Sequence, residues 1–562
     1  MTQLPPVSRG PSMPGGRLTR SSALAGSAVG VLAAAVAVGA AHLTAGLTVP
    51  QSSPVVAVGQ AAIDLTPGPV KDFAISSFGA DDKTVLLSGI LVVLGAAAAV
   101  IGMLAVRRLA LGIGGLAVLA GIGLAAALTR PTATPVYAVP TLAGAAAGAF
   151  ALTRLVRAAA PAFPGPPASP AATAQDAALP LRPPDLPARP GSTFTYLPNP
   201  QAPGPSSRPD RRRFLAASGI AAVAAGASAI AGRELITRQD VSRARAALRF
   251  PAPAAAAPPL PPGSSLDIPG LSPFITPNGS FYRVDTALLL PEVDPATWQL
   301  RIHGMVRREV VISFAELLRR PLVEDYVTLT CVSDPVGGPY VGNAKWLGAR
   351  LADLIRQARP LAAADQLLCT SVDGFTSGTP LQVVLDGRDA LLAIAMNGAA
   401  LPVAHGFPAR MVVPGLYGYV SATKWVTDIE VTTFASAGAY WVQRGWSQRA
   451  PIKTESRIDV PASGTSLAPG RTRVAGVAWA QHKGIAAVEV RVDAGPWHQA
   501  RLAAVPGIDT WRQWVWDWDA APGGHVLAAR ATDATGYTQT AAVAQPVPNG
   551  ASGYPTVTVT VR

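Results

Sequence analysis

Five long apolar segments constrain the fold of this chain more than any other feature. They cover residues 21–49, 84–106, 109–128, 136–153 and 214–232, and they contain no Asp, Glu, Lys or Arg. Each approaches or exceeds the roughly 20 residues that a helix needs to cross a hydrocarbon layer of about 30 Å. The core helices of a soluble protein would carry a polar face, which these segments lack. We therefore predict five transmembrane helices, whose small residues allow close packing.

Positive residues lie mostly on one side of the predicted spans. Thirteen occupy the N-terminal tail and the loops after the second and fourth spans: Arg9, Arg17, Arg20, Arg107, Arg108, Arg154, Arg157, Arg182, Arg189, Arg208, Arg211, Arg212 and Arg213. The opposite loops carry three: Lys71, Lys83 and Arg130. Because cytoplasmic loops retain Lys and Arg, we expect a multi-pass protein of the cytoplasmic membrane with an extracytoplasmic C-terminal region. The net charge of +13 is then explained by topology and not by a nucleic-acid partner.

The fifth span follows the sequence Asp210-Arg211-Arg212-Arg213-Phe214-Leu215. This pattern before a mildly apolar stretch resembles a twin-arginine export signal, which directs folded proteins across the membrane. Ordinary topology-setting arginines are the alternative interpretation. An internal signal of this kind would double as an anchor.

Composition divides the chain into parts. The expected parts are a cytoplasmic tail (1–20), four transmembrane helices (21–156), a Pro-rich cytoplasmic linker (157–210), the fifth helix (211–235), a second linker (236–265), a mixed α+β domain (266–435) and a β-sandwich (436–562). Fifteen prolines within 158–210 favour disorder there. In the sandwich, short alternating strands are separated by turns rich in Gly, Pro and Asp.

Only two cysteines occur, Cys331 and Cys369, and they form no C-x-x-C pair. This excludes a Cys-only zinc site, a four-Cys iron–sulfur cluster and a disulfide-rich scaffold. Cys331 ends an apolar strand and opens a glycine-containing loop, where a thiolate can reach a metal or ligand. A small apolar core residue is the alternative reading of such a cysteine.

His405, Arg410 and Lys424 flank the expected strand 411–413. Together these side chains can hold an anion such as a phosphate, although a scattered solvated surface is also compatible with the pattern.

Short motifs between residues 281 and 457 resemble the sulfite oxidase family of molybdopterin enzymes in their order and spacing. The motifs are Phe281-Tyr282-Arg283, Trp298-Gln299-Leu300-Arg301-Ile302-His303-Gly304, Thr328-Leu329-Thr330-Cys331, Asp373-Gly374-Phe375-Thr376, Met396-Asn397-Gly398, His405-Gly406-Phe407-Pro408-Ala409-Arg410, Val412-Val413-Pro414-Gly415, Lys424-Trp425 and Ile429-Glu430-Val431. The tail, with Trp514-Val515-Trp516-Asp517-Trp518, is similar to that family's immunoglobulin-like dimerisation domain. The resemblance is to a membrane-anchored bacterial type and leaves the first four spans without a role.

The resemblance implies a molybdenum–molybdopterin cofactor, with Cys331 as the protein ligand of the metal. Cys331 and Arg283 would be the catalytic residues of an oxygen-atom transfer. His405, Arg410 and Lys424 would engage the pterin phosphate, and Asp373 would accept hydrogen bonds from pterin nitrogens. The full set of implied cofactor-binding residues is Phe281, Tyr282, Arg283, Asp285, Asp373, His405, Arg410, Ser421, Thr423 and Lys424.

Departures from the family pattern concern the substrate. The loop after the cysteine reads Val332-Ser333-Asp334 and lacks the family's arginine, Ile394 stands in place of a tyrosine, and Val284-Asp285 in place of Asn-His. The expected function is oxygen-atom transfer on a small sulfur-containing substrate outside the cytoplasmic membrane. Because a small dianion needs several convergent cations, a neutral or larger substrate such as a sulfoxide is at least as well supported as sulfite. A reductase of sulfoxides or N-oxides and a non-catalytic membrane-anchored binding protein are the alternatives. A retained Cys331 argues against the second.

The chain has six histidines, and only His42 lies in a predicted span. We therefore expect no haem and no iron–sulfur cluster within this chain, and electrons would pass to a separate electron-transfer partner or a quinone. A homodimer through the C-terminal domain is a further implication of the resemblance.

Overall fold

A computed structural model describes all residues except 1–19, 68–69, 71–81, 131–132, 160–210 and 239–240. The expected Pro-rich linker lies almost entirely outside the described residues. Two compact units are present, one of long helices and one that contains residues 238–562.

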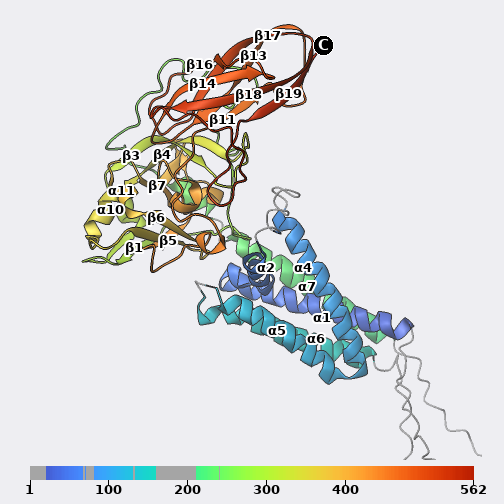
Figure 1. The fold of residues 1–562 in the computed structure, drawn as a ribbon. Coiled ribbons are helices and arrows are strands. Elements are labelled where there is room, and N and C mark those ends of the chain that lie inside the picture. The colour runs from blue at the N-terminus through green and yellow to red at the C-terminus, as the bar shows by residue number, and fades with distance from the viewer. Residues whose placement is uncertain (1–19, 68–69, 71–81, 131–132, 160–210, 239–240) are drawn as a thin grey trace, which may run out of the picture. The chain divides into compact units, whose positions relative to one another are not determined.

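The helical unit confirms the five predicted spans. Its helices are α1 (Arg20–Leu47), α2 (Pro54–Leu65), α4 (Asp82–Arg107), α5 (Leu109–Leu128), α6 (Ala138–Ala159) and α7 (Arg211–Arg238) (Figure 1). All except α2 are long and apolar enough to cross a membrane. The chain is therefore a multi-pass membrane protein.

Glycines allow the closest helix contacts in this unit. Gly26 and Gly30 of α1 face Gly102 of α4, and a β-carbon added at Gly30 would overlap the carbonyl oxygen of Ala98. Small residues four apart let membrane helices approach until their backbones touch. The predicted role of small residues is thus visible in the packing of α1 against α4.

Two sheets build the α+β part of the second unit. One has the order β3-β4-β7-β8, with β9 paired to β7, and the other has the order β2-β1-β10-β5-β6. The strands are β1 (Gln299–Gly304), β2 (Val310–Ser313), β3 (Leu322–Thr330), β4 (Val341–Arg350), β5 (Gln366–Ser371), β6 (Thr376–Pro380), β7 (Leu391–Met396), β8 (Ala399–Ala400), β9 (Arg410–Val412) and β10 (Val426–Thr432). Short helices connect them: α9 (Phe314–Leu318), α10 (Leu351–Ala358), α11 (Leu381–Leu385) and α12 (Gly418–Ser421).

Apolar side chains from both sheets meet in one core. Leu300 and Ile429 come from the second sheet, whereas Leu392 and Met411 come from the first. Each of the four is fully buried. Cys331 directly follows β3, Arg410 begins β9 and Lys424 precedes β10, so these strands position three of the predicted site residues.

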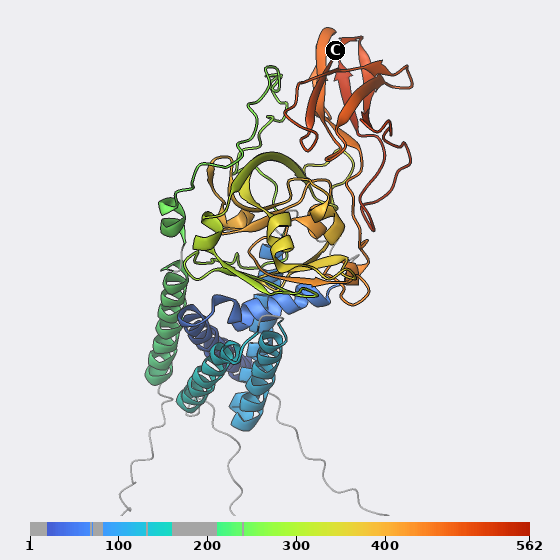
Figure 2. The same cartoon turned by 90° about the vertical axis from the view of Figure 1, so that its left-hand side faces the viewer.

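The C-terminal region is a β-sandwich, as predicted. Its sheets have the orders β11-β13-β17-β16 and β12-β19-β18-β14-β15. The strands of this region are orange to red in Figure 2. The strands are β11 (Glu455–Val460), β12 (Ser466–Leu467), β13 (Gly470–Trp479), β14 (Ile485–Val492), β15 (His498–Gln499), β16 (Arg501–Leu502), β17 (Arg512–Ala520), β18 (Gly523–Asp533) and β19 (Thr556–Val561). Val474 and Trp514 of one sheet share a core with Val488, Leu527 and Val559 of the other.

Part of the second expected linker is ordered. After the short helix α8 (Ser242–Ala247), the chain runs beside β3, where Ala254 N–H donates to Leu322 O and Glu324 N–H donates to Ala255 O, both at 2.8 Å. Val241 is buried in a core cluster with Phe281. The segment therefore belongs to the packed domain.

Candidate functional site

Cys331 directly follows β3 and begins a loop that returns to β4. Its N–H donates to Tyr340 O at 2.9 Å, and its carbonyl accepts from Asp334 N–H at 3.2 Å. Asp334 Oδ1 also accepts from Tyr340 N–H at 2.8 Å. These bonds close the loop, and they leave Cys331 as a half-buried free thiol.

Neighbouring groups shift the pKa of the Cys331 thiol in opposite directions. Burial raises the pKa of Cys331, and the nearby Asp334 carboxylate raises it further. Ser333 and Lys424 lower this pKa, the serine through hydrogen bonds. The Ser333 hydroxyl oxygen lies 3.0 Å from the Cys331 sulfur. A thiol of this kind needs a cation, such as a metal ion, to become a thiolate at neutral pH.

Tyr282 lies near both the Cys331 thiol and the Arg410 guanidinium. Burial raises its pKa well above the ordinary value, Cys331 adds to that increase, and Arg410 opposes it. The Tyr282 ring stacks on Phe281 with centroids 5.3 Å apart, and the Phe281 ring contacts His405 edge-on at 5.5 Å. The structure thus brings Phe281, Tyr282, Cys331, His405 and Arg410 together.

Arg410, on β9, is a buried cation. Its guanidinium donates to His405 O at 3.1 Å and to Met411 O and Ala422 O at 3.4 Å, and it lies 5.1 Å from the Trp346 ring centroid. Burial lowers the pKa of Arg410 to about 10. No carboxylate forms an ion pair with it among the described residues. A buried cation held only by carbonyl groups is stabilised further by an anionic ligand.

The imidazole of His405 has one ring nitrogen that can accept a hydrogen bond. Its Nε2 lies 3.3 Å from Asn278 O, and because a carbonyl oxygen only accepts, Nε2 carries the proton. Burial, together with Arg410 and Lys424, lowers the pKa of His405 to about 4. The imidazole is therefore neutral at pH 7 with an unprotonated Nδ1. This modifies the expectation that His405 serves as a cationic phosphate ligand.

Lys424 and Arg283 share one carboxylate. The Lys424 Nζ lies 2.9 Å and the Arg283 Nε 3.1 Å from Asp285 Oδ2. The side chains of Lys424 and Asp285 are 11% and 3% exposed, whereas that of Arg283 is 43% exposed. Asp285 thus orients two cations, and only Arg283 faces solvent.

The side chains of three predicted cofactor-binding residues form hydrogen bonds within the protein. Asp373, in the turn between β5 and β6, accepts from Phe375 N–H at 3.2 Å. The Ser421 hydroxyl donates to Leu416 O and Tyr417 O at 3.1 and 3.0 Å, and the Thr423 hydroxyl lies 2.6 Å from that of Ser377. The Asp373 turn still lies beside Lys424, because Val372 N–H donates to Trp425 O at 3.0 Å.

Sequence reasoning missed Asn278, Trp346 and Ser333 as parts of the site. Asn278 holds His405, Trp346 lies under Arg410, and Ser333 contacts the thiol. Nothing in the local sequence indicates the first two contacts, because their partners lie 127 and 64 residues away. Ser333 could have been found from its position two residues after the cysteine.

Ile394, which stands where the family pattern has a tyrosine, is fully buried in the core.

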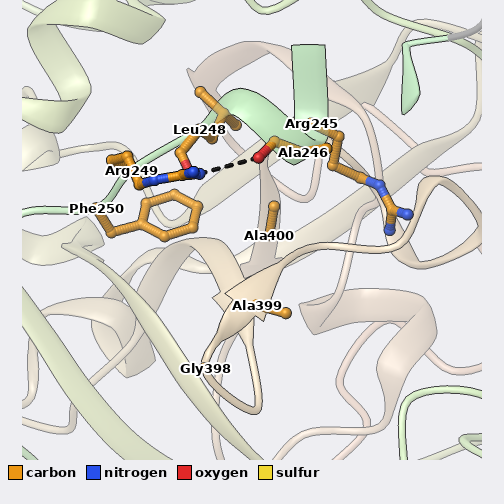
Figure 3. A pocket seen from close by; sticks show the side chains of 8 residues that line it. All are labelled: Arg245, Ala246, Leu248, Arg249, Phe250, Gly398, Ala399 and Ala400. Atoms are coloured by element: carbon orange, nitrogen blue, oxygen red, sulfur yellow. Dashed lines mark hydrogen bonds between the residues drawn. The ribbon is translucent and has the colours of Figure 1, made fainter. Parts of the chain in front are cut away.

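A separate pocket of about 520 Å³ lies where α8 meets the β7–β8 hairpin (Figure 3). It contains none of the predicted site residues. Arg249 crosses it and donates to Ala246 O at 2.9 Å and Leu248 O at 3.0 Å. Its lining residues are Arg245, Ala246, Leu248, Arg249, Phe250, Gly398, Ala399 and Ala400.

Comparison with known proteins identifies relatives of the α+β part. Residues 287–441 match the family described as oxidoreductase molybdopterin binding domain. Sulfite oxidase of Gallus gallus is 30% identical over 290 residues, which are 43% of this chain and 62% of that protein. The uncharacterised oxidoreductase YuiH of Bacillus subtilis is 32% identical over 156 residues, 28% of this chain and 75% of that protein.

Among solved structures, the sulfane dehydrogenase SoxCD from Paracoccus pantotrophus aligns with a TM-score of 0.43 at 24% identity, covering 47% of this chain and 74% of that one. The chain spans less than two thirds of the length of the sulfite oxidases that it matches.

Proposed function

This chain belongs to the sulfite oxidase family of molybdopterin-binding oxidoreductases, and on that premise we propose that it transfers oxygen atoms to a small sulfur-containing substrate outside the cytoplasmic membrane. One observation carries the proposal: the free thiol of Cys331 and the buried guanidinium of Arg410, which is bound to carbonyl groups alone among the described residues, both lie close enough to Tyr282 to influence its hydroxyl. A soft sulfur at one end and a buried cation at the other suit a cofactor that carries a metal and a phosphate.

The residues present fit such a cofactor. Cys331 would be the protein ligand of molybdenum, because it is a half-buried thiol on a loop that backbone bonds hold in place. Arg410 and Lys424 would hold the phosphate, with Asp285 orienting the lysine. When bound, the cofactor supplies two-electron redox chemistry and the transferred oxygen.

The other predicted residues would have supporting roles. The stacked rings of Phe281 and Tyr282 would contact the cofactor near the thiol. Neutral His405 would accept a hydrogen bond from a cofactor N–H through Nδ1. Asp373 would accept from pterin nitrogens with the carboxylate oxygen that Phe375 does not use. The hydroxyls of Ser421 and Thr423 would shape the backbone turn before Lys424.

The charge beside the thiol limits the substrate. Arg283 is the exposed cation of the set, and the loop after Cys331 contributes the Asp334 carboxylate in place of an arginine. One exposed cation without a second arginine favours a neutral or singly charged substrate over a dianion such as sulfite. In the oxidative direction the substrate gains one oxygen from water and releases two protons and two electrons. Reduction of a sulfoxide or N-oxide is the same reaction reversed, and the same observation favours it as second candidate.

Purified full-length protein tests this proposal. We expect one molybdenum and one pterin per chain by elemental and fluorescence analysis. Turnover should appear with an artificial electron acceptor and a neutral or monoanionic sulfur compound, or with a reduced donor and a sulfoxide or N-oxide. Protein that binds neither metal nor pterin after expression in a cofactor-producing host would contradict the enzymatic proposal and leave a binding protein.

We also propose that the N-terminus lies in the cytoplasm, and that α7 follows a twin-arginine signal for export of the folded domain. The support is the distribution of arginines and the triplet Arg211-Arg212-Arg213 at the start of α7. Replacing this triplet with lysines keeps the charge, and it should leave the catalytic domain inside, scored by protease treatment of spheroplasts. Normal export of the lysine variant would show that charge alone matters.

Electrons would leave through a quinone or a separate protein, and the sandwich would support a homodimer. Quinone reduction by the purified protein and its mass in detergent test these two points.

A further inference from the structure

The side chain of Ser333 is in direct contact with the thiol of the site. Its hydroxyl oxygen lies 3.0 Å from the Cys331 sulfur, where either atom can donate while the thiol keeps its proton. A thiolate bound to a metal has no proton and only accepts. In that state the Ser333 hydroxyl must donate to the sulfur.

The loop itself holds Ser333 in this position. Backbone bonds tie Cys331 to Tyr340 and Asp334 to Cys331, and the Asp334 carboxylate caps Tyr340 N–H. Ser333 lies inside this closed loop, two residues after the cysteine. The contact with the sulfur therefore exists before any cofactor binds.

We propose that Ser333 is a positioning residue that raises the reduction potential of the metal bound to Cys331, by donating its hydroxyl hydrogen to the thiolate. The inference rests on the proposed function, because it requires a metal on Cys331. A donor to a metal-bound sulfur withdraws electron density from it, so that the sulfur donates less to the metal and the reduced state is stabilised.

The backbone N–H of Ser333 also acts on the sulfur, and every substitution at this position keeps it, so the variants change the side-chain donor alone. The Asp334 carboxylate acts on Cys331 in the opposite sense, and Lys424, whose Nζ pairs with Asp285, acts through charge alone. Asp334 and Ser333 act on the Cys331 sulfur in opposite directions. Removal of the Ser333 hydroxyl should therefore allow the effect of Asp334 to increase.

The test compares full-length Ser333→Ala and Ser333→Thr with the wild type. A mediated redox titration without substrate would follow the paramagnetic one-electron state of molybdenum by electron paramagnetic resonance, with metal content measured in parallel. We expect a lower midpoint potential and altered g-values in Ser333→Ala. Ser333→Thr, which keeps the hydroxyl, should match the wild type.

An unchanged potential in Ser333→Ala, with metal bound, would overturn the inference and leave the proposed function standing. Equal shifts in both variants would also overturn it, since side-chain shape and not the hydroxyl would then matter. Loss of metal from Ser333→Ala but not Ser333→Thr would make the hydroxyl a requirement for ligation, which contradicts a tuning role. A wild type without molybdenum would instead refute the proposed function.

Discussion

The thiol end of the site (Cys331, Ser333 and Asp334) and its cationic end (Arg410 and Lys424, beside the neutral His405) hold their polar groups differently. At the thiol end, backbone bonds close a loop and leave the reactive group half-buried. At the cationic end, Arg410 is buried and bound to three carbonyl groups. The cationic end therefore carries a charge that an anion would balance, whereas the thiol end gains its main partner only with the metal. Substitutions at the two ends should have different consequences.

The largest effect is expected at the thiol end. Cys331→Ser should reduce turnover to background, because a hydroxyl is a poor substitute for a soft thiolate ligand. The matched control is Cys369→Ala, since Cys369 is fully buried on β5 and burial raises its pKa to about 12. This control should keep turnover at a stability cost of about 1–2 kcal/mol. Steady-state assays and metal analysis would decide, and full activity of Cys331→Ser would refute the assignment.

At the cationic end, Arg410→Ala should lower cofactor occupancy. It removes a charge-assisted contact of roughly 1.5–3 kcal/mol, or about 10- to 150-fold in affinity. Lys424→Ala should act in the same direction but less, because its Nζ already pairs with Asp285. Pterin fluorescence after release from the protein measures occupancy.

The control for these variants is Arg301→Ala, which removes an exposed arginine paired with Glu309. Full pterin content in Arg410→Ala, together with lost turnover, would place Arg410 in the substrate pocket. It would then contradict the role of the cationic end in binding the cofactor.

Substitution of Arg283 should affect substrate binding without affecting cofactor binding. Because its side chain is 43% exposed and its partner Asp285 keeps Lys424, Arg283→Ala should retain the cofactor. KM for an anionic substrate should rise roughly tenfold, whereas KM for a neutral sulfoxide should not change. A loss of cofactor in this variant would assign Arg283 to the cationic end.

The smallest effect concerns Glu455, a buried residue on β11 whose pKa is influenced by Asp334 of the thiol end. Burial raises the pKa of Glu455 from 4.5 to about 8. The folded state therefore binds the proton more tightly, and this contribution to stability is complete below about pH 4.5 and lost as the pH rises to about 8.

Glu455→Gln, which cannot ionise, should flatten the fall of Tm between pH 5 and pH 8. Tryptophan fluorescence is a suitable probe, because all 11 tryptophans lie between residues 298 and 518. Asp325 and Asp334, whose pKa values burial raises to about 7, should leave part of the pH dependence in place. Identical pH profiles in variant and wild type would show that Glu455 ionises freely in the folded protein.

Local patterns were sufficient for the elements of the fold. The ends of the five spans were predicted to within six residues, because length and hydropathy are properties of each segment alone. The strands of the sandwich, such as β13 and β19, followed from alternation between turns. The packed course of residues 241–255 beside β3 was not predicted, since a Pro/Ala stretch has no periodic pattern.

The site was predicted only in part. The short motifs pointed to Cys331, Arg410 and Lys424, and their cofactor roles stay predictions. The neutral state of His405 was not visible in the sequence, because it depends on burial and on two cations brought near by the fold. The engaged hydroxyls of Ser421 and Thr423 were likewise invisible.

By itself, then, the sequence determined the membrane spans, the strand-rich tail and the residue types available for chemistry, since hydrophobicity and side-chain identity are set locally. Only the tertiary structure decided which of these residues meet. Tyr282 lies close to both Cys331 and Arg410, although 79 residues separate those two, because one sheet contains both β3, which Cys331 follows, and β9, which Arg410 begins. Charge and proton affinity depend on distance and burial, and both arise only when the chain has folded.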